Sequence, residues 1–165
     1  SRKIKIKYLL KKLLKKKNIN QDIDSLSKKF NKLILNKILK KKLNKVVIRF
    51  LEKYKKKYSF FISSGTPQEE LNLILKEKKI DSYFDKIYGS PQTKNFHIKK
   101  IFKDYKFSKK NLIFVGDGES DFIAALKSNI KFVQIGNNFI SKKKNLKIDQ
   151  FHEIENLILS KNFFN

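Results

Sequence analysis

The chain has 165 residues, of which 40% are hydrophobic, and it contains no cysteine. It can therefore bury the core of one ordinary domain, whereas disulfides, thiolate metal sites and cysteine nucleophiles are excluded. No apolar run reaches the length of a transmembrane helix and no secretory signal is visible, so we expect a cytoplasmic protein without a membrane span.

The formal net charge of +25 is concentrated in the first third of the chain, since residues 1–57 hold 22 of the 40 lysines and arginines but only three of the 15 acids. This charge is compatible with a basic module that binds nucleic acid or an anionic membrane, and that interpretation stays open. Only Arg2 and Arg49 are arginines, and the stacking aromatics of single-strand binders are not interleaved with the basic residues. The composition therefore argues against nucleic acid as a partner.

Apolar residues at helical spacing predict three helices in this basic third. The predicted helices span residues 1–17, 26–38 and 46–54. The polar stretch 18–24 predicts a break, with Asp24 or Ser25 capping the second helix. The lysine run 40–42 predicts a bend before the third. The first helix could lie on an anionic membrane, but we expect its apolar stripe to pack on its own protein. Residues 1–57 are thus expected to be all-helical.

From Tyr58 onward, short β-rich runs alternate with helical patterns. The expected strands are residues 59–62, 84–88, 111–115 and 131–135, and the expected helices begin at Pro67 or span residues 93–105, 122–127 and 149–159. Alternating strands and helices indicate βαβ units and a parallel sheet. The predicted fold class is therefore α/β.

The most informative stretch is NLIFVGDGESD, residues 111–121. Its apolar run resembles a strand buried on both faces, and Gly116 ends that strand. Asp117 and Asp121 follow, at the carboxyl end of a sheet strand, where open α/β sheets bind ligands. Two carboxylates on so short a loop repel each other unless a cation or a proton lies between them. Mg²⁺, which prefers carboxylate oxygen and keeps several waters, suits this pattern.

Two other interpretations of the loop remain open. Asp117 and Ser120 could simply cap the following helix, because Asp and Ser are favoured at that position. Gly116 and Gly118 after a strand could also belong to an S-adenosylmethionine site. That site needs an acid after the next strand, and residues 134–138 contain none. The metal site is the interpretation that we favour.

Three motifs follow successive predicted strands: FISSGTPQEEL with Ser64, YGSPQTK with Lys94, and VGDGESD with Asp117 and Asp121. In this order the chain resembles the haloacid dehalogenase-like phosphohydrolases, closest to the phosphoglycolate-phosphatase-like branch with a helical cap. The resemblance implies a Rossmann-like parallel-sheet core over residues 58–165 and a helical cap region over residues 1–57.

The resemblance also implies a Mg²⁺-dependent phosphatase that acts on a small phosphorylated metabolite, such as phosphoglycolate or a sugar phosphate, through an aspartyl-phosphate. Ser64 and the N–H of Gly65 would bind a phosphoryl oxygen, and Lys94 would hold the phosphate and neutralise developing charge. Asp117 would ligate Mg²⁺, with Asp121 completing or orienting the metal shell. Taken alone, Ser64 could be a helix cap and Lys94 a solvated lysine; their co-occurrence favours the functional roles.

One departure from the family pattern is large. Its members attack phosphorus with an aspartate in a DxDx(T/V) motif on the first core strand, before the cap. Asp22 and Asp24 have DxD spacing, but the preceding KKKNINQ cannot form a buried strand. We therefore expect a fragment truncated at its N-terminus, without the first core strand and inactive by itself. A non-catalytic relative is the other interpretation. The motifs specify neither a substrate nor an oligomeric state.

Overall fold

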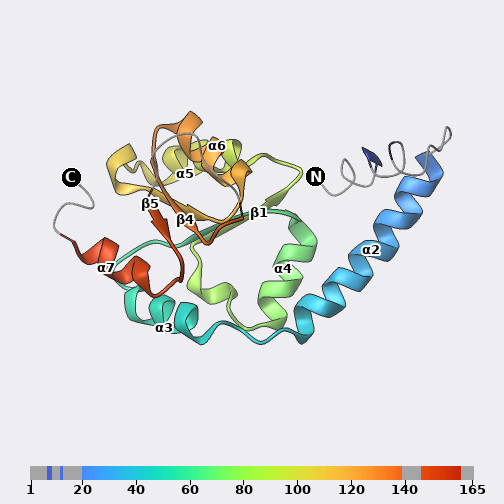
Figure 1. Cartoon of the computed structure of the whole chain (residues 1–165), viewed down its shortest axis with the longest axis horizontal. Helices are drawn as coiled ribbons and strands as arrows, with labels where there is room; N and C mark the ends of the chain where they lie inside the picture. The colour runs from blue at the N-terminus through green and yellow to red at the C-terminus, as the bar shows by residue number, and fades with distance from the viewer. Residues whose placement is uncertain (1–6, 9–11, 13–19, 139–145, 161–165) are drawn as a thin grey trace. The chain divides into compact units, whose positions relative to one another are not determined.

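The computed structural model describes residues 7–8, 12, 20–138 and 146–160 of the chain. Within them, helices and parallel strands alternate from residue 61 onward, as the sequence predicts (Figure 1). The elements are α2 (Asn20–Lys40), α3 (Lys45–Tyr54), β1 (Phe61–Pro67), α4 (Gln68–Glu77), η1 (Asp81–Tyr83), β2 (Lys86–Ser90), α5 (Lys94–Tyr105), η2 (Lys109–Asn111), β3 (Ile113–Gly116), α6 (Glu119–Ser128), β4 (Lys131–Ile135), β5 (Leu146–Ile148) and α7 (Glu153–Leu159).

The chain divides into two compact units. The first comprises Ser1–Leu43, as far as described, with Lys57–Pro91; the second comprises Asn44–Lys56 with the described part of Gln92–Asn165. The boundary at residue 57 between a cap region and a core domain stays a prediction. No described helix combines the length and apolar character that crossing a membrane requires.

The first unit contains one βαβ motif. Strand β1 pairs with β2 in parallel, and α4 is the crossover between them. One face of α4 buries Leu71, Ile74 and Leu75, the stripe that the sequence predicts. Glu69 and Glu70 lie in its first turn, where carboxylates interact favourably with the helix dipole. Helix α2 packs on α4 in the same unit.

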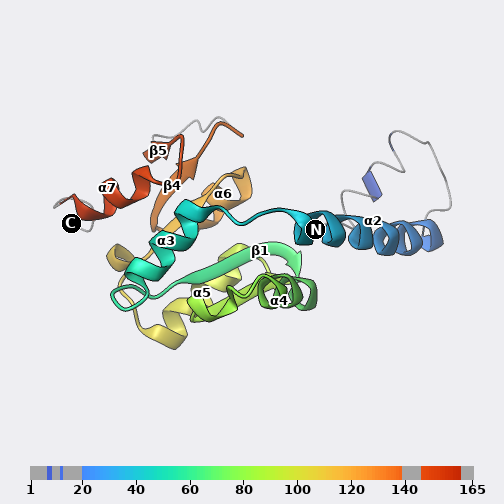
Figure 2. The same ribbon diagram turned by 90° about the horizontal axis from the view of Figure 1, so that it is seen from below.

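The second unit contains a three-stranded parallel sheet in the order β3-β4-β5. Helix α6 is the crossover from β3 to β4, and α5 packs beside α6 (Figure 1). Strands β4 and β5 lie next to each other in Figure 2. The central strand β4 holds fully buried Val133, and the adjoining core includes Ile98 of α5 and Ala125 of α6. Phe122 of α6 meets Phe132 of β4 edge to face, with ring centroids 5.6 Å apart.

Several predicted details differ from the structure. Asn20–Asp24 lie in helix α2, so the predicted polar break at residues 18–24 is wrong for residues 20–24. The predicted caps at Asp24 and Ser25 are also wrong, because both residues lie inside this helix. Ile23 is 8% exposed, and its burial outweighs the weak helix propensity of its polar neighbours. The first predicted helix, residues 1–17, lies largely outside the described residues. The bend after Lys40 is confirmed.

Strand β3 differs in burial. All four of its residues are half-buried rather than buried on both faces, because β3 has one strand neighbour in its sheet. Strand β4, which is flanked on both sides, has three buried residues. Strand β5 was not predicted; its three residues are too few for a recognisable pattern.

Candidate active site

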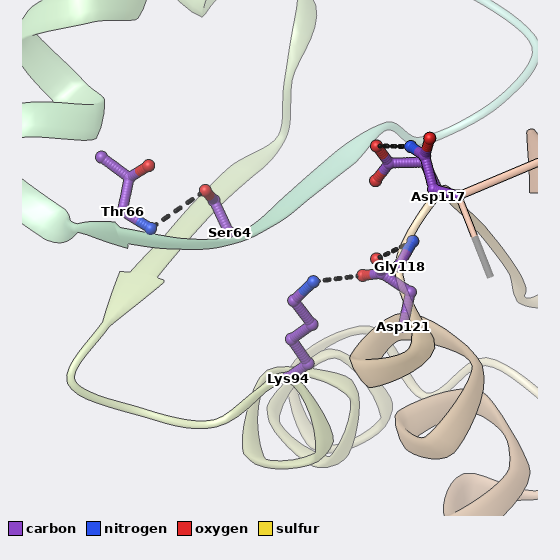
Figure 3. A network of polar contacts seen from close by, with 7 residues as sticks. Ser64, Thr66, Lys94, Asp117, Gly118 and Asp121 are labelled. Carbon is purple, nitrogen blue, oxygen red and sulfur yellow. Dashed lines mark hydrogen bonds and ion pairs between the residues drawn. The ribbon is translucent and has the colours of Figure 1, made fainter. Parts of the chain in front are cut away.

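Ser64 and Gly65 lie at an irregularity of strand β1. The β1–β2 pairing is regular from Phe61 to Ser63 and resumes only at Pro67. Between these points the Thr66 N–H donates to Ser64 Oγ over 3.1 Å (Figure 3). Because the hydroxyl oxygen accepts this bond, its own proton remains available for an acceptor such as a phosphoryl oxygen. Ser64 is thus oriented by a turn of its own strand rather than by the helix that follows.

The side chain of Gln68 secures this irregular stretch. Gly89 N–H donates to Gln68 Oε1 over 2.6 Å, and Gln68 Nε2 donates to Ile87 O over 3.1 Å. The carboxamide therefore pairs with strand β2 as a peptide group would, where β1 itself leaves the regular register. No sequence pattern indicated this role, because a glutamine in the first helical turn is ordinary.

Lys94 and Asp121 come together in the second unit, although 27 residues separate them. Lys94 is the first residue of α5, which is capped by the Thr93 side chain accepting from Phe96 N–H. Its ammonium group donates to Asp121 Oδ1, as Figure 3 shows. The lysine side chain is 21% exposed and the carboxylate 8%, so the pair is largely removed from water. Partial burial strengthens such an ion pair.

Asp121 has a second partner in its own loop. The Gly118 N–H donates to Asp121 Oδ2 over 3.1 Å, so the third residue of α6 reaches back to the helix start as in a capping box. A Cβ atom on Gly116 would lie 2.6 Å from Asp121 Cβ and Cγ, which explains the glycine at the end of β3. The side chain that accepts from the start of α6 is therefore that of Asp121, and not that of Asp117 or Ser120.

Asp117 has a different environment. It is exposed, and its Oδ2 accepts from Asn138 Nδ2 over 2.9 Å. Asn138 follows β4, so adjacent parallel strands bring the two residues to the same sheet edge, a signal that sequence reasoning could have used. No group of three His, Asp or Glu side chains within the described residues forms a metal cluster. One exposed carboxylate nevertheless fits Mg²⁺, which binds proteins through one or two carboxylates and keeps its waters.

The structure thus brings Lys94 to Asp121 and presents Asp117 on the same loop. Ser64 and Gly65 belong to the other unit, and their convergence with Lys94 stays a prediction. Asp22 and Asp24 lie in helix α2, in agreement with their rejection as a strand-borne nucleophile motif.

The βαβ units, with the acidic loop at the end of β3, form a Rossmann-like α/β core. The family model described as haloacid dehalogenase-like hydrolase matches residues 2–135. Because this match covers most of the chain, the protein belongs to the haloacid dehalogenase-like hydrolase family, and this membership makes it an enzyme by resemblance. No curated protein matches the sequence significantly.

Solved structures share the fold. A putative phosphatase from Clostridium difficile is 21% identical with a TM-score of 0.75, and the match covers 92% of this chain and 76% of that chain. A predicted phosphoglycolate phosphatase from Haemophilus somnus is 21% identical with a TM-score of 0.75, covering 90% and 72%. A predicted phosphatase from Clostridium acetobutylicum is 25% identical with a TM-score of 0.63, covering 72% and 60%. None of these three supports the alternative of a nucleic-acid- or membrane-binding module.

Proposed function

We propose that this chain supplies the phosphate- and metal-binding part of a Mg²⁺-dependent phosphatase that acts on a small phosphorylated metabolite. The observation that carries the proposal is the contact between Lys94 and the Asp117–Asp121 loop. It supports the resemblance because it joins two of the three motifs by which the family is recognised. The solved structures with the same fold include a putative phosphatase and a predicted phosphoglycolate phosphatase, which agrees with this class of reaction.

In this proposal Lys94 binds a phosphoryl oxygen and neutralises the charge that grows in the transition state. Asp121 holds the Lys94 ammonium and the start of α6 in place, because both of its oxygens already accept hydrogen bonds. Ser64 donates its hydroxyl proton to a second phosphoryl oxygen, and the Gly65 N–H assists it. Asp117 is the residue that would hold Mg²⁺. When bound, the ion supplies charge screening and alignment of the phosphate.

We also propose that the reaction is hydrolysis through an aspartyl-phosphate intermediate. Within the described residues, no strand carries a DxD pair that could attack phosphorus. Ser64, Lys94 and Asp117 stabilise charge but do not replace a nucleophilic carboxylate. We therefore expect these 165 residues alone to show no turnover of p-nitrophenyl phosphate. Turnover that disappears with Asp117→Ala would contradict this expectation and would place the nucleophile in the acidic loop.

Binding of inorganic phosphate tests the proposed site without requiring turnover. Isothermal titration with Mg²⁺ present should show one site that Lys94→Met weakens roughly 10- to 100-fold, the range for a charge-assisted hydrogen bond. Ser64→Ala should weaken it less, and chelation of the metal should weaken it as well. Lys99→Met, which removes an exposed charge from the same helix, is the matched control. If Lys94→Met and Lys99→Met weaken phosphate binding equally, the phosphate is attracted by the overall positive charge of the protein and has no specific site.

A further inference from the structure

A pocket of about 160 Å³ lies between α3 and α7, both in the second unit, and none of the candidate active-site residues lines it. Its apolar surface comes from Val46, Phe50 and Phe151. Phe50 is 7% exposed and meets Phe151 edge to face, with ring centroids 5.3 Å apart. Figure 1 shows α3 and α7 side by side. The size is comparable to an engineered cavity of about 150 Å³ that binds benzene. One aromatic ring would therefore fit.

Charged side chains complete the wall of this pocket. Glu155 accepts hydrogen bonds from the Lys53 ammonium and, over 2.7 Å, from the Tyr54 hydroxyl. These bonds hold the pKa of Glu155 below its ordinary value. Its negative charge is thus already compensated by Lys53. Arg49 and His152 also line the pocket, and no described carboxylate forms an ion pair with Arg49. The pocket consequently has a spare positive charge next to an aromatic surface.

Arg49 stands out in this chain, because 38 of its 40 basic residues are lysines. Arginine has a planar fork that binds a carboxylate through two parallel hydrogen bonds and stacks on aromatic rings, which lysine does not do. On α3 it lies three residues after Val46 and four before Lys53, on the face that lines the pocket. Arg49 is exposed, so its guanidinium is open to an anion that enters the pocket from solvent.

We propose that the α3–α7 pocket binds a small organic anion consisting of one aromatic ring with a carboxylate. The ring packs against Val46, Phe50 and Phe151, and the carboxylate binds the Arg49 guanidinium. His152 lies on the same rim, and its imidazole N–H offers a second donor. This site goes beyond the proposed phosphatase site and stands whether or not that proposal is correct.

Titration of the ¹⁵N-labelled chain with benzoate, followed by amide NMR shifts, tests this site. We expect saturable shifts confined to α3 and residues 150–156, with a Kd of roughly millimolar order for so small a ligand. Arg49→Gln, which keeps most of the stem, should weaken binding at least about tenfold. Lys56→Gln removes an exposed charge just beyond α3 and should leave the affinity unchanged.

Two further probes separate the contributions of ring and charge. Acetate carries the charge without the ring, and benzyl alcohol carries the ring without the charge; each should bind at least about tenfold more weakly than benzoate. The proposal is overturned if benzoate shifts no amides of α3 and α7, or if Arg49→Gln binds it as tightly as the unchanged chain. Equal binding of acetate or benzyl alcohol would also overturn it.

Discussion

The ammonium group of Lys94 and the carboxylate of Asp121 form an ion pair that links the first residue of α5 to the first turn of α6. Ser128 Oγ donates to Asn95 Oδ1 over 2.9 Å and joins the same two helices at another point. The pair therefore contributes to the packing of the unit as well as to the proposed site. A change of either residue must be assessed for stability before an effect on phosphate binding is assigned to chemistry.

Lys94→Met should lower the free energy of unfolding because it leaves the Asp121 carboxylate largely buried without its cation. Exposed pairs contribute up to about 1 kcal/mol and breaking fully buried ones costs roughly 3–5 kcal/mol, so we expect about 2 kcal/mol here. Urea titration measures the difference. Lys100→Met is the control, since the Lys100–Asp104 pair is more exposed and its loss should cost under about 1 kcal/mol. Equal costs in the two variants would contradict the interpretation.

Gly116→Ala should displace Asp121, because the added methyl group would lie 2.6 Å from Asp121 Cβ and Cγ. Overpacking of this kind costs about 1–3 kcal/mol. Gly65→Ala provides a contrast, since nothing lies within 4 Å of its Cβ position, and its cost should stay within about 0.5 kcal/mol. Thermal unfolding of both variants checks the difference. A Gly116→Ala protein as stable as Gly65→Ala would mean that the loop relaxes freely.

Asp117→Asn should weaken Mg²⁺ binding while leaving the fold intact. Asp117 is exposed, and an asparagine oxygen can still accept from Asn138. Losing the charged ligand should weaken Mg²⁺ at least about tenfold. Titration calorimetry gives the affinity. Glu119→Gln, a neighbouring exposed acid without a proposed role, should leave the affinity close to that of the unchanged chain. If both changes weaken Mg²⁺ alike, the ion is attracted by diffuse charge and has no site.

Glu155→Gln should make stability less sensitive to acid. Hydrogen bonds from Lys53 and then Tyr54 hold the pKa of Glu155 below its ordinary value of 4.5. A carboxyl with a lowered folded pKa stabilises the fold above its unfolded pKa, and this contribution is lost as pH falls through the folded value. Unfolding curves between about pH 6 and pH 3 should therefore decline more steeply for the unchanged chain than for Glu155→Gln. Glu77→Gln, on the exposed end of α4, should follow the unchanged chain.

The sequence predicted those features of the fold that depend on local pattern. The alternation of β-rich runs with helical stripes placed the start of α4, both ends of α5 and both ends of β4 to within about one residue. It failed at residues 20–24, where burial of Ile23 extends α2 through polar residues. It also missed β5, whose three residues pair with β4 only through tertiary structure.

The candidate site was predictable in its residues and less so in their contacts. The acidic loop after a β-rich run indicated Asp117 and Asp121 together. In the structure, one Asp121 oxygen accepts from Lys94 and the other from Gly118, whereas Asp117 is exposed. The contact with Lys94 depends on the packing of α5 against α6. No spacing rule expresses such packing. The hydrogen bonds between the Gln68 side chain and strand β2 depend in the same way on the register shift of β1.

Strand β3 has consequences for how the protein behaves in solution. Its half-buried residues, Ile-Phe-Val-Gly, pair with β4 along one side, and no other described strand borders its second side. Such a side can pair with a strand of another molecule and start aggregation. The net charge of +25 keeps molecules apart at low ionic strength. Salt near 0.1 M screens that repulsion beyond about 10 Å, so solubility should fall as salt is added.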